Sequence, residues 1–125
     1  MAFLFIHHDD YVILQLTGTF SRMGLKEITR RVEEIESSTD VTPNRVVDVG
    51  SVDVFDISFE DVFDFAQIRK AMPLKNPVKS AFIVDRDLTY GMTQMFKTLN
   101  DHPQITIRIV RSLAEAEAWF GESPF

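Results

Sequence analysis

The sequence predicts an α/β protein: a single domain, residues 1–125, with a mixed, mostly parallel sheet that opens with an antiparallel hairpin and carries four helices. Strand-like apolar segments alternate with helical segments along most of the chain, which calls for right-handed parallel crossovers. The first two apolar runs are instead separated only by the polar stretch HHDD, which is typical of a hairpin. A chain of 125 residues with 45% hydrophobic content is large enough to bury one core.

A change of period separates the hairpin from the first helix. The apolar runs 3–7 and 11–17 flank HHDD, and the second run ends at Thr17 and Gly18. From Ser21 onward the apolar positions recur at steps of three and four residues: Leu25, Ile28, Val32 and Ile35. Charged residues lie between them, so the segment is predicted to be an amphipathic helix that ends near the polar cluster 37–40.

The remaining elements alternate between strand and helix. The sequence predicts a short buried strand at 45–50, a helix at 58–72, a strand at 78–85, a helix at 87–101, a strand at 105–111 and a helix at 112–120. Pro73 closes the second helix, Pro103 stops the third, and Ser112 is positioned to cap the fourth. The complete order is strand, strand, helix, and then three further pairs of strand and helix.

The composition narrows the classes of function. A net charge of −6 argues against binding to the phosphate backbone of nucleic acid. The segment 46–68 contains six carboxylates and no Lys or Arg, which indicates either a solvated face or a surface that attracts a basic partner. The apolar runs are far shorter than the roughly 20 residues of a membrane span, and the chain has no cysteine. We therefore expect a soluble, cytoplasmic protein without disulfides.

Three motifs carry a resemblance to a known family: VFDISF at 54–59, YGMTQMF at 90–96 and IRIVRSLAEAEAWF at 107–120. Together with the order of elements, they resemble the SpoIIAA-like branch of the STAS domain superfamily, whose small proteins are often grouped with the CRAL-TRIO lipid-binding fold. The first motif matches the anti-sigma-factor-antagonist pattern at Asp56 and Ser58 and departs from it at Ile57 and Phe59. The resemblance implies a regulatory binding protein, and the CRAL-TRIO grouping implies an apolar or lipid-like ligand.

Ser58 has two interpretations. The resemblance implies a serine that a partner kinase phosphorylates to abolish binding, because a phosphate adds roughly −1.5 to −2 charges to a contact surface. Locally, Ser58 and Asp61 have the spacing of a capping box, and Ile57 and Val62 flank them as a hydrophobic staple would. No Lys or Arg lies within ten residues of Ser58 along the chain to pair with a phosphate. The cap is the favoured interpretation, and the switch stays open.

Aromatic and acidic residues surround this serine. Four residues recur at helical spacing and are predicted to form a core stripe: Phe59, Val62, Phe63 and Ala66. Phe55 and Phe65 fall outside that stripe and are candidates for exposure. We therefore predict a partner-docking surface made of one aromatic residue and four carboxylates: Phe55, Asp56, Glu60, Asp61 and Asp64.

A small-ligand site, if the chain has one, is expected beyond the carboxyl ends of the parallel strands. The candidate lining residues are two aspartates at or near strand ends and four residues of the third helix: Asp48, Asp85, Tyr90, Gly91, Met92 and Met95. A glycine inside a helix costs about 1 kcal/mol relative to alanine, so Gly91 indicates either close packing on the sheet or a ligand near its backbone. The string HHDD is better explained by a turn than by a metal site.

The common catalytic motifs GxSxG, HExxH, GxxxxGK and GxGxxG do not occur in this sequence. We therefore predict a binding module with a protein partner and without enzyme activity, cofactor or metal. A carrier of a small apolar ligand between the second and third helices is the first alternative, and an enzyme is the second. The exposed edge of the hairpin leaves a homodimer open. Phe59 and Trp119 are both predicted to be core residues.

Overall fold

The computed structural model of the chain describes residues 2–84, 87–99 and 102–122. Its elements follow the predicted order: β1 (Ala2–His7), β2 (Tyr11–Ser21), α1 (Arg22–Ser38), β3 (Asn44–Asp56), α2 (Phe59–Lys70), β4 (Val78–Ile83), α3 (Asp87–Leu99), β5 (Ile105–Val110) and α4 (Leu113–Phe120). They form a five-stranded sheet in the order β1-β2-β3-β4-β5, with β1 antiparallel to β2 and all other neighbours parallel. The predicted mixed α/β fold is confirmed.

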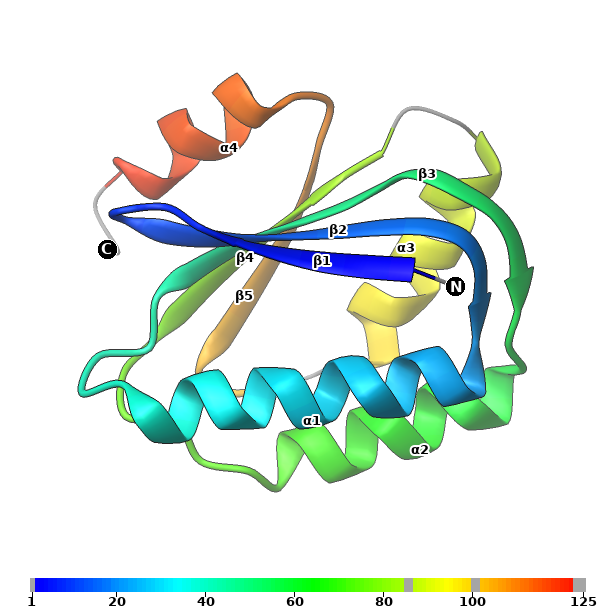
Figure 1. Cartoon of the computed structure of the whole chain (residues 1–125), viewed down its shortest axis with the longest axis horizontal. Coiled ribbons are helices and arrows are strands. Elements are labelled where there is room, and N and C mark those ends of the chain that lie inside the picture. The colour runs from blue at the N-terminus through cyan, green and yellow to red at the C-terminus, as the bar shows by residue number, and fades with distance from the viewer. Residues whose placement is uncertain (1, 85–86, 100–101, 123–125) are drawn as a thin grey trace.

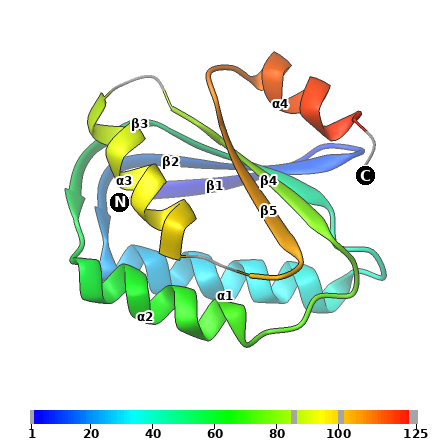
Figure 2. The same ribbon diagram turned by 180° about the vertical axis from the view of Figure 1, so that it is seen from behind.

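Helices α1, α2 and α3 lie on one face of the sheet, and α4 lies on the other (Figures 1 and 2). Each of the first three helices connects two neighbouring parallel strands, and every crossover advances in the same direction across the sheet. Right-handed crossovers that all advance in one direction place their helices on the same face. Helix α4 follows the last strand and makes no crossover, and it packs against β3, β4 and β5 from the opposite face.

Strand β3 is more than twice as long as the strand predicted at 45–50. Its pairing with β4 ends at Asp48, but its pairing with β2 continues until Asp56 lies opposite Ser21. The prediction ended the strand where its apolar run ends, whereas the backbone pairing continues through a polar stretch. Two register shifts and a φ of 78° at Gly18 accommodate this long ribbon. As a consequence, α1 and α2 begin beside each other.

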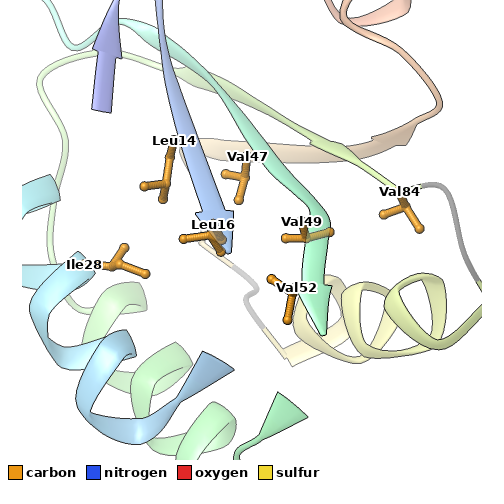
Figure 3. Packing of buried hydrophobic residues seen from close by; sticks show 7 residues of the cluster. All are labelled: Leu14, Leu16, Ile28, Val47, Val49, Val52 and Val84. Atoms are coloured by element: carbon orange, nitrogen blue, oxygen red, sulfur yellow. The ribbon is translucent and has the colours of Figure 1, made fainter. Parts of the chain in front are cut away.

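Two apolar clusters hold the sheet between its helices. On the face of α1–α3, alternate strand residues point toward α1, as Figure 3 shows for Leu14, Leu16, Val47 and Val49 with Ile28. On the opposite face, a second cluster meets α4: Tyr11, Val46, Ala81, Val110, Ala116 and Trp119. Neighbours such as Val46 and Val47 belong to different clusters, as expected for a strand buried on both faces. Trp119 is a core residue, as predicted.

Candidate functional site

The serine of the VFDISF motif caps helix α2. The Ser58 hydroxyl accepts a hydrogen bond from the backbone N–H of Asp61 at 3.1 Å, and an Asp61 carboxylate oxygen accepts one from the backbone N–H of Ser58 at 3.2 Å. The predicted capping box is therefore present. Ser58 is exposed and Asp61 is partly buried, so the cap leaves Ser58 accessible at the carboxyl edge of the sheet.

A basic side chain reaches this end of α2 from another helix. Arg22, the first residue of α1, places its Nε 3.7 Å from an Asp61 carboxylate oxygen. Ser21 caps α1 in the same way, because its hydroxyl accepts a hydrogen bond from the N–H of Gly24 at 3.2 Å. The long pairing of β2 with β3 brings the two capped ends together. No Lys or Arg lies within ten residues of Ser58 along the chain, but the fold brings Arg22 to this end of α2.

The phenylalanines around Ser58 are exposed where burial was predicted and partly buried where exposure was predicted. Phe59 and Phe63 are 58% and 42% exposed, and their rings stack with centroids 6.3 Å apart. Phe55 and Phe65 are partly buried and line the space beneath the sheet. The prediction that Phe59 and Phe63 are core is therefore wrong, and the candidates for exposure, Phe55 and Phe65, are partly buried instead. Helix α2 carries apolar residues on several sides, so periodicity alone did not identify its buried side, which Val62 and Ala66 define.

The acidic residues of the predicted docking surface accompany the exposed rings. Asp56, Glu60 and Asp64 are exposed, whereas Asp61 is partly buried within the capping box. Positions 59, 60, 63 and 64 lie on adjacent stripes of one helix. We call Phe59, Glu60, Phe63 and Asp64 the outer face of α2. Phe59 and Phe63 take the place that the prediction gave to Phe55.

The residues predicted to line a ligand site do not assemble around one space. Asp48 lies inside β3 rather than at its end, and its carboxylate accepts a hydrogen bond from the N–H of Gly50 at 3.0 Å. Asp85 and the side chain of Met95 lie outside the described part of the chain. Tyr90 is exposed and accepts a hydrogen bond from Gln94 at 2.8 Å. Tyr90 therefore belongs to the surface of α3.

The two remaining candidates on α3 have different surroundings. Gly91 is exposed, and a Cβ built on it would meet nothing within 4 Å, so close packing on the sheet does not explain this glycine. Met92, one residue later, is partly buried and lines a cavity together with Thr93. Among the six predicted lining residues, Met92 borders this cavity.

An apolar cavity of about 120 Å³ lies between the sheet and the layer of α1, α2 and α3. Its walls come from all three helices and from strands β2 to β5: Leu14, Leu16, Phe20, Leu25, Ile28, Thr29, Val32, Arg45, Val47, Val49, Phe55, Ile57, Val62, Phe65, Arg69, Ser80, Phe82, Met92, Thr93, Ile105 and Ile107. Most of these side chains are apolar. Arg45 and Arg69 are the charged members, and they lie at the end of the cavity near the C-terminus of α2.

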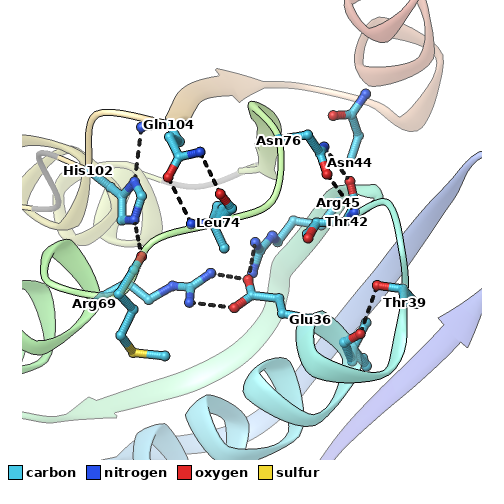
Figure 4. A network of polar contacts seen from close by, with 12 residues as sticks. Glu36, Thr39, Thr42, Asn44, Arg45, Arg69, Leu74, Asn76, His102 and Gln104 are labelled. Carbon is cyan, nitrogen blue, oxygen red and sulfur yellow. Dashed lines mark hydrogen bonds and ion pairs between the residues drawn. The ribbon is translucent and has the colours of Figure 1, made fainter.

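These two arginines share one carboxylate, Glu36 of α1 (Figure 4). Arg69 donates to both oxygens of Glu36, with Nη1 2.7 Å from Oε1. Arg45 donates from Nη2 to Oε2 at 3.1 Å. The side chains of Arg69, Glu36 and Arg45 are only 4%, 11% and 16% exposed. We call these three residues the buried charge cluster, and two positive charges against one negative leave it at +1.

Burial and neighbouring charge shift the pKa values within this cluster. Burial, reinforced by Arg69, lowers the pKa of Arg45 to about 10, although Glu36 opposes the shift. Burial alone would raise the pKa of Glu36, but the hydrogen bonds and charges of Arg69 and Arg45 outweigh it and hold that pKa below its usual value. Glu36 and Arg45 are therefore both charged at neutral pH.

Sequence reasoning did not identify the buried charge cluster, although a signal was present. Arg69 follows Val62 and Ala66 at the spacing of the buried side of α2, and Glu36 follows Ile28 and Val32 at the spacing of α1. A charged residue at a core position of its own helix requires a partner of opposite charge in the fold. The partners come from other elements, so the pairing itself was not readable from the sequence.

Polar contacts around the cluster fasten the loops at the amino-terminal edge of the sheet (Figure 4). The Asn76 side chain exchanges hydrogen bonds with the backbone of Thr42 at 2.7 and 2.9 Å. Gln104 does the same with the backbone of Leu74, at 2.8 Å in both directions. His102 accepts from the N–H of Gln104 at Nδ1 and donates from Nε2 to the carbonyl of Met72. Separate groups of hydrogen bonds thus hold the loops at this end of the cavity.

No protein-family model and no curated protein sequence matches this chain. Among solved structures, an uncharacterised protein of the DUF3478 family from Shewanella loihica, described as having a SpoIIAA-like fold, superimposes with a TM-score of 0.62. The two chains are 14% identical, and the match covers 94% of this chain and 91% of that chain. This chain has a SpoIIAA-like fold. The resemblance predicted from the three motifs is therefore confirmed at the level of the fold.

The described residues hold neither a membrane-spanning helix nor a cluster of metal-binding side chains. No helix in this part of the chain is long and apolar enough to cross a membrane. Within the same residues, His, Asp and Glu side chains do not gather in groups of three that could hold a metal ion. The SpoIIAA-like chain therefore presents two distinct candidates for function: the outer face of α2 and the cavity behind it.

Proposed function

We propose that this SpoIIAA-like chain is a non-catalytic, cytoplasmic regulatory module that binds another protein through the outer face of α2. The fold supports a module of the STAS type. The observation that carries the proposal is the stacked pair of exposed rings, Phe59 and Phe63, beside the exposed carboxylates of Glu60 and Asp64 on the neighbouring stripe of α2. Adjacent exposed aromatic side chains leave apolar area in water and are favoured at the centres of protein interfaces.

The charges around the rings indicate the chemistry of the partner. The segment 46–68 contains six carboxylates and no basic residue, and the whole chain has a net charge of −6. Such a field attracts a basic surface and accelerates its association. We therefore expect the partner to present an apolar patch rimmed by Lys or Arg, and we expect binding to weaken as salt rises.

Affinity capture from the organism's own lysate, followed by titration of the captured protein, tests this proposal. The double variant Phe59→Ser/Phe63→Ser should lose the partner. The matched control Val41→Ser/Leu113→Ser also removes two exposed apolar side chains, but from other parts of the surface, and should retain it. Equal binding by both double variants would exclude the outer face of α2 as the contact surface.

Ser58 is the proposed control point of this surface. A phosphate on its hydroxyl would lie at the N-terminus of α2, near Arg22 and one residue from Phe59. Asp and Asn are both good caps, so Ser58→Asp adds charge while Ser58→Asn does not. Because the proposed partner is basic, we expect the added negative charge of the Asp variant to strengthen binding relative to the Asn variant. Equal affinities of the two variants, or an unmodified Ser58 in protein isolated from its own cells, would argue against the switch.

A further inference from the structure

We infer that the cavity beneath the sheet binds a medium-chain carboxylate, with its head group at Arg45, Arg69 and Ser80 and its chain along the inner side of α2. This site lies behind α2, whereas the outer face faces solvent, so the two sites can be tested separately. Charge, hydrogen bonding and shape each support a ligand of this kind.

The polar end of the cavity carries an excess of positive charge. Glu36 neutralises one of two guanidinium groups, and within the described residues no other carboxylate acts on Arg45. Burial and repulsion from Arg69 both lower the pKa of Arg45, so its charge is only partly compensated. A buried charge without a partner is costly, and an anionic head group would bring the sum of charges to zero.

Hydrogen-bond donors are available at the same end. Arg45 and Ser80 are register partners on β3 and β4, so their side chains are neighbours on one face of the sheet. Ser80 is 4% exposed and lines the cavity, yet its hydroxyl makes no hydrogen bond to another described residue. Arg45 donates only to Glu36 among these residues, which leaves its Nε and Nη1 for another acceptor. A carboxylate has enough acceptor sites for both side chains.

The shape of the cavity suits a chain rather than a compact ring. Arg69 and Ile57 both line it, and they lie at opposite ends of α2, a helix of 12 residues that spans roughly 18 Å at 1.5 Å per residue. One buried water needs about 10–15 Å³ of cavity volume. The cavity of about 120 Å³ therefore has room for on the order of ten water-sized groups, or about ten non-hydrogen atoms of a ligand. An acid of eight to ten carbons has that size.

The two ends of the cavity differ in a way that selects an amphiphile. The end near Ile57 is formed by Phe20, Phe55 and Val62, which offer only apolar contact. A neutral hydrocarbon would fill this end but leave the excess charge unmatched, and an amine would add to it. A molecule with one anionic head and one apolar chain satisfies both ends.

Isothermal titration of the whole chain, first stripped of bound lipid, with octanoate tests the inference. We expect octanoate to bind about tenfold or more tighter than 1-octanol, because only the acid makes charge-assisted hydrogen bonds, and we expect octylamine not to bind. Comparable affinities for octanoate and 1-octanol would overturn the role of the arginines. No binding of either compound would overturn the site itself.

Methionine methyl groups report where the probe binds. Met92 lines the cavity and Met23 is exposed on α1, so ¹³C-methyl spectra during the titration should shift the Met92 signal and leave Met23 unchanged. A shift confined to Met23 would place octanoate on the surface and contradict the inference.

Two variants test the head-group contacts. Ser80→Ala removes one small hydroxyl and should weaken octanoate about tenfold, while Ser51→Ala, an exposed serine on β3, should change nothing. Arg69→Met leaves Glu36 and Arg45 as a balanced pair, so this variant should fold but lose octanoate selectivity over 1-octanol. Unchanged octanoate affinity in both Ser80→Ala and Arg69→Met would refute the assignment.

Discussion

The two ends of helix α2 are built in different ways. At the N-terminal end, Ser58 and Asp61 satisfy each other's backbone groups within a single turn, and Phe59 and Glu60 between them are exposed. At the C-terminal end, Arg69 is buried against Glu36 of α1, which also receives Arg45 of β3. One end depends on residues three positions apart, and the other depends on three elements that only the fold brings together.

This difference is consistent with the two different kinds of partner proposed for the two ends. The exposed end presents rings and carboxylates to solvent, where a second macromolecule can reach them. The buried end faces a cavity that admits only a small molecule. A change at the exposed end is expected to alter binding with little effect on stability, while a change at the buried end is expected to alter stability first.

Removal of the carboxylate from the buried charge cluster should have the largest effect. Glu36→Leu leaves two guanidinium groups without a counter-charge, and we expect it to lower the free energy of unfolding by about 3–5 kcal/mol. Arg69→Met leaves one balanced pair and should cost less. Urea unfolding measures both variants. Equal losses would mean that the excess positive charge has no energetic consequence.

Acid should weaken the same cluster. The pKa of Glu36 in the folded chain lies below its usual value of 4.5, so its contribution is complete above that value and is lost as the pH falls through the folded pKa. The free energy of unfolding should therefore drop in this acidic window. Glu36→Gln, which has no carboxylate to titrate, should show a flatter profile there. An identical profile in this variant would assign the acid sensitivity to other carboxylates.

Loss of the cap at the exposed end should cost less. Ser58→Ala removes the acceptor for the N–H of Asp61, and we expect the free energy of unfolding to fall by about 1 kcal/mol. Ser58→Asn retains an acceptor and should stay close to the wild type. If Ser58→Ala were as stable as Ser58→Asn, the capping box would not contribute to stability in solution.

The same contrast explains what was predictable from the sequence. The order of elements, the cap at Ser58 and the burial of Trp119 follow from local patterns, and all three are present in the structure. The cluster of Glu36, Arg45 and Arg69 joins positions far apart in the chain, so local patterns place Glu36 and Arg69 on the buried sides of their helices but do not show that they pair. The ion pair between Arg22 and Asp61 could not be predicted for the same reason, since it depends on the long pairing of β2 with β3.

The orientation of α2 was a different kind of failure. Phenylalanines at positions 59, 63 and 65 allowed more than one apolar side of the helix, and the prediction chose the side that contains Phe59. The structure turns Phe55 and Phe65 inward and leaves Phe59 exposed because Val62, Ala66 and the paired Arg69 fill the buried side. A charged residue in need of a buried partner thus helped to decide which apolar side of the helix packs.

The smallest effect on stability is expected for Phe59. Because this ring is 58% exposed, Phe59→Ala should change the free energy of unfolding by less than about 0.5 kcal/mol. Val62, three residues later, is 4% exposed, and Val62→Ala should cost about 1–3 kcal/mol although it removes fewer atoms. Urea unfolding of both variants at several protein concentrations makes the comparison.

A large loss for Phe59→Ala would contradict an open outer face and would require something that covers the ring in solution. A second copy of the chain could cover the ring in this way. Because association stabilises the folded chain by mass action, the loss in the free energy of unfolding caused by Phe59→Ala would then grow with protein concentration. Sedimentation of the wild type and of Phe59→Ala distinguishes these possibilities. If the wild type is a dimer and Phe59→Ala is a monomer, this face is a contact between two copies of the chain. A wild-type monomer with an unaffected variant leaves Phe59 and Phe63 free to meet a different protein.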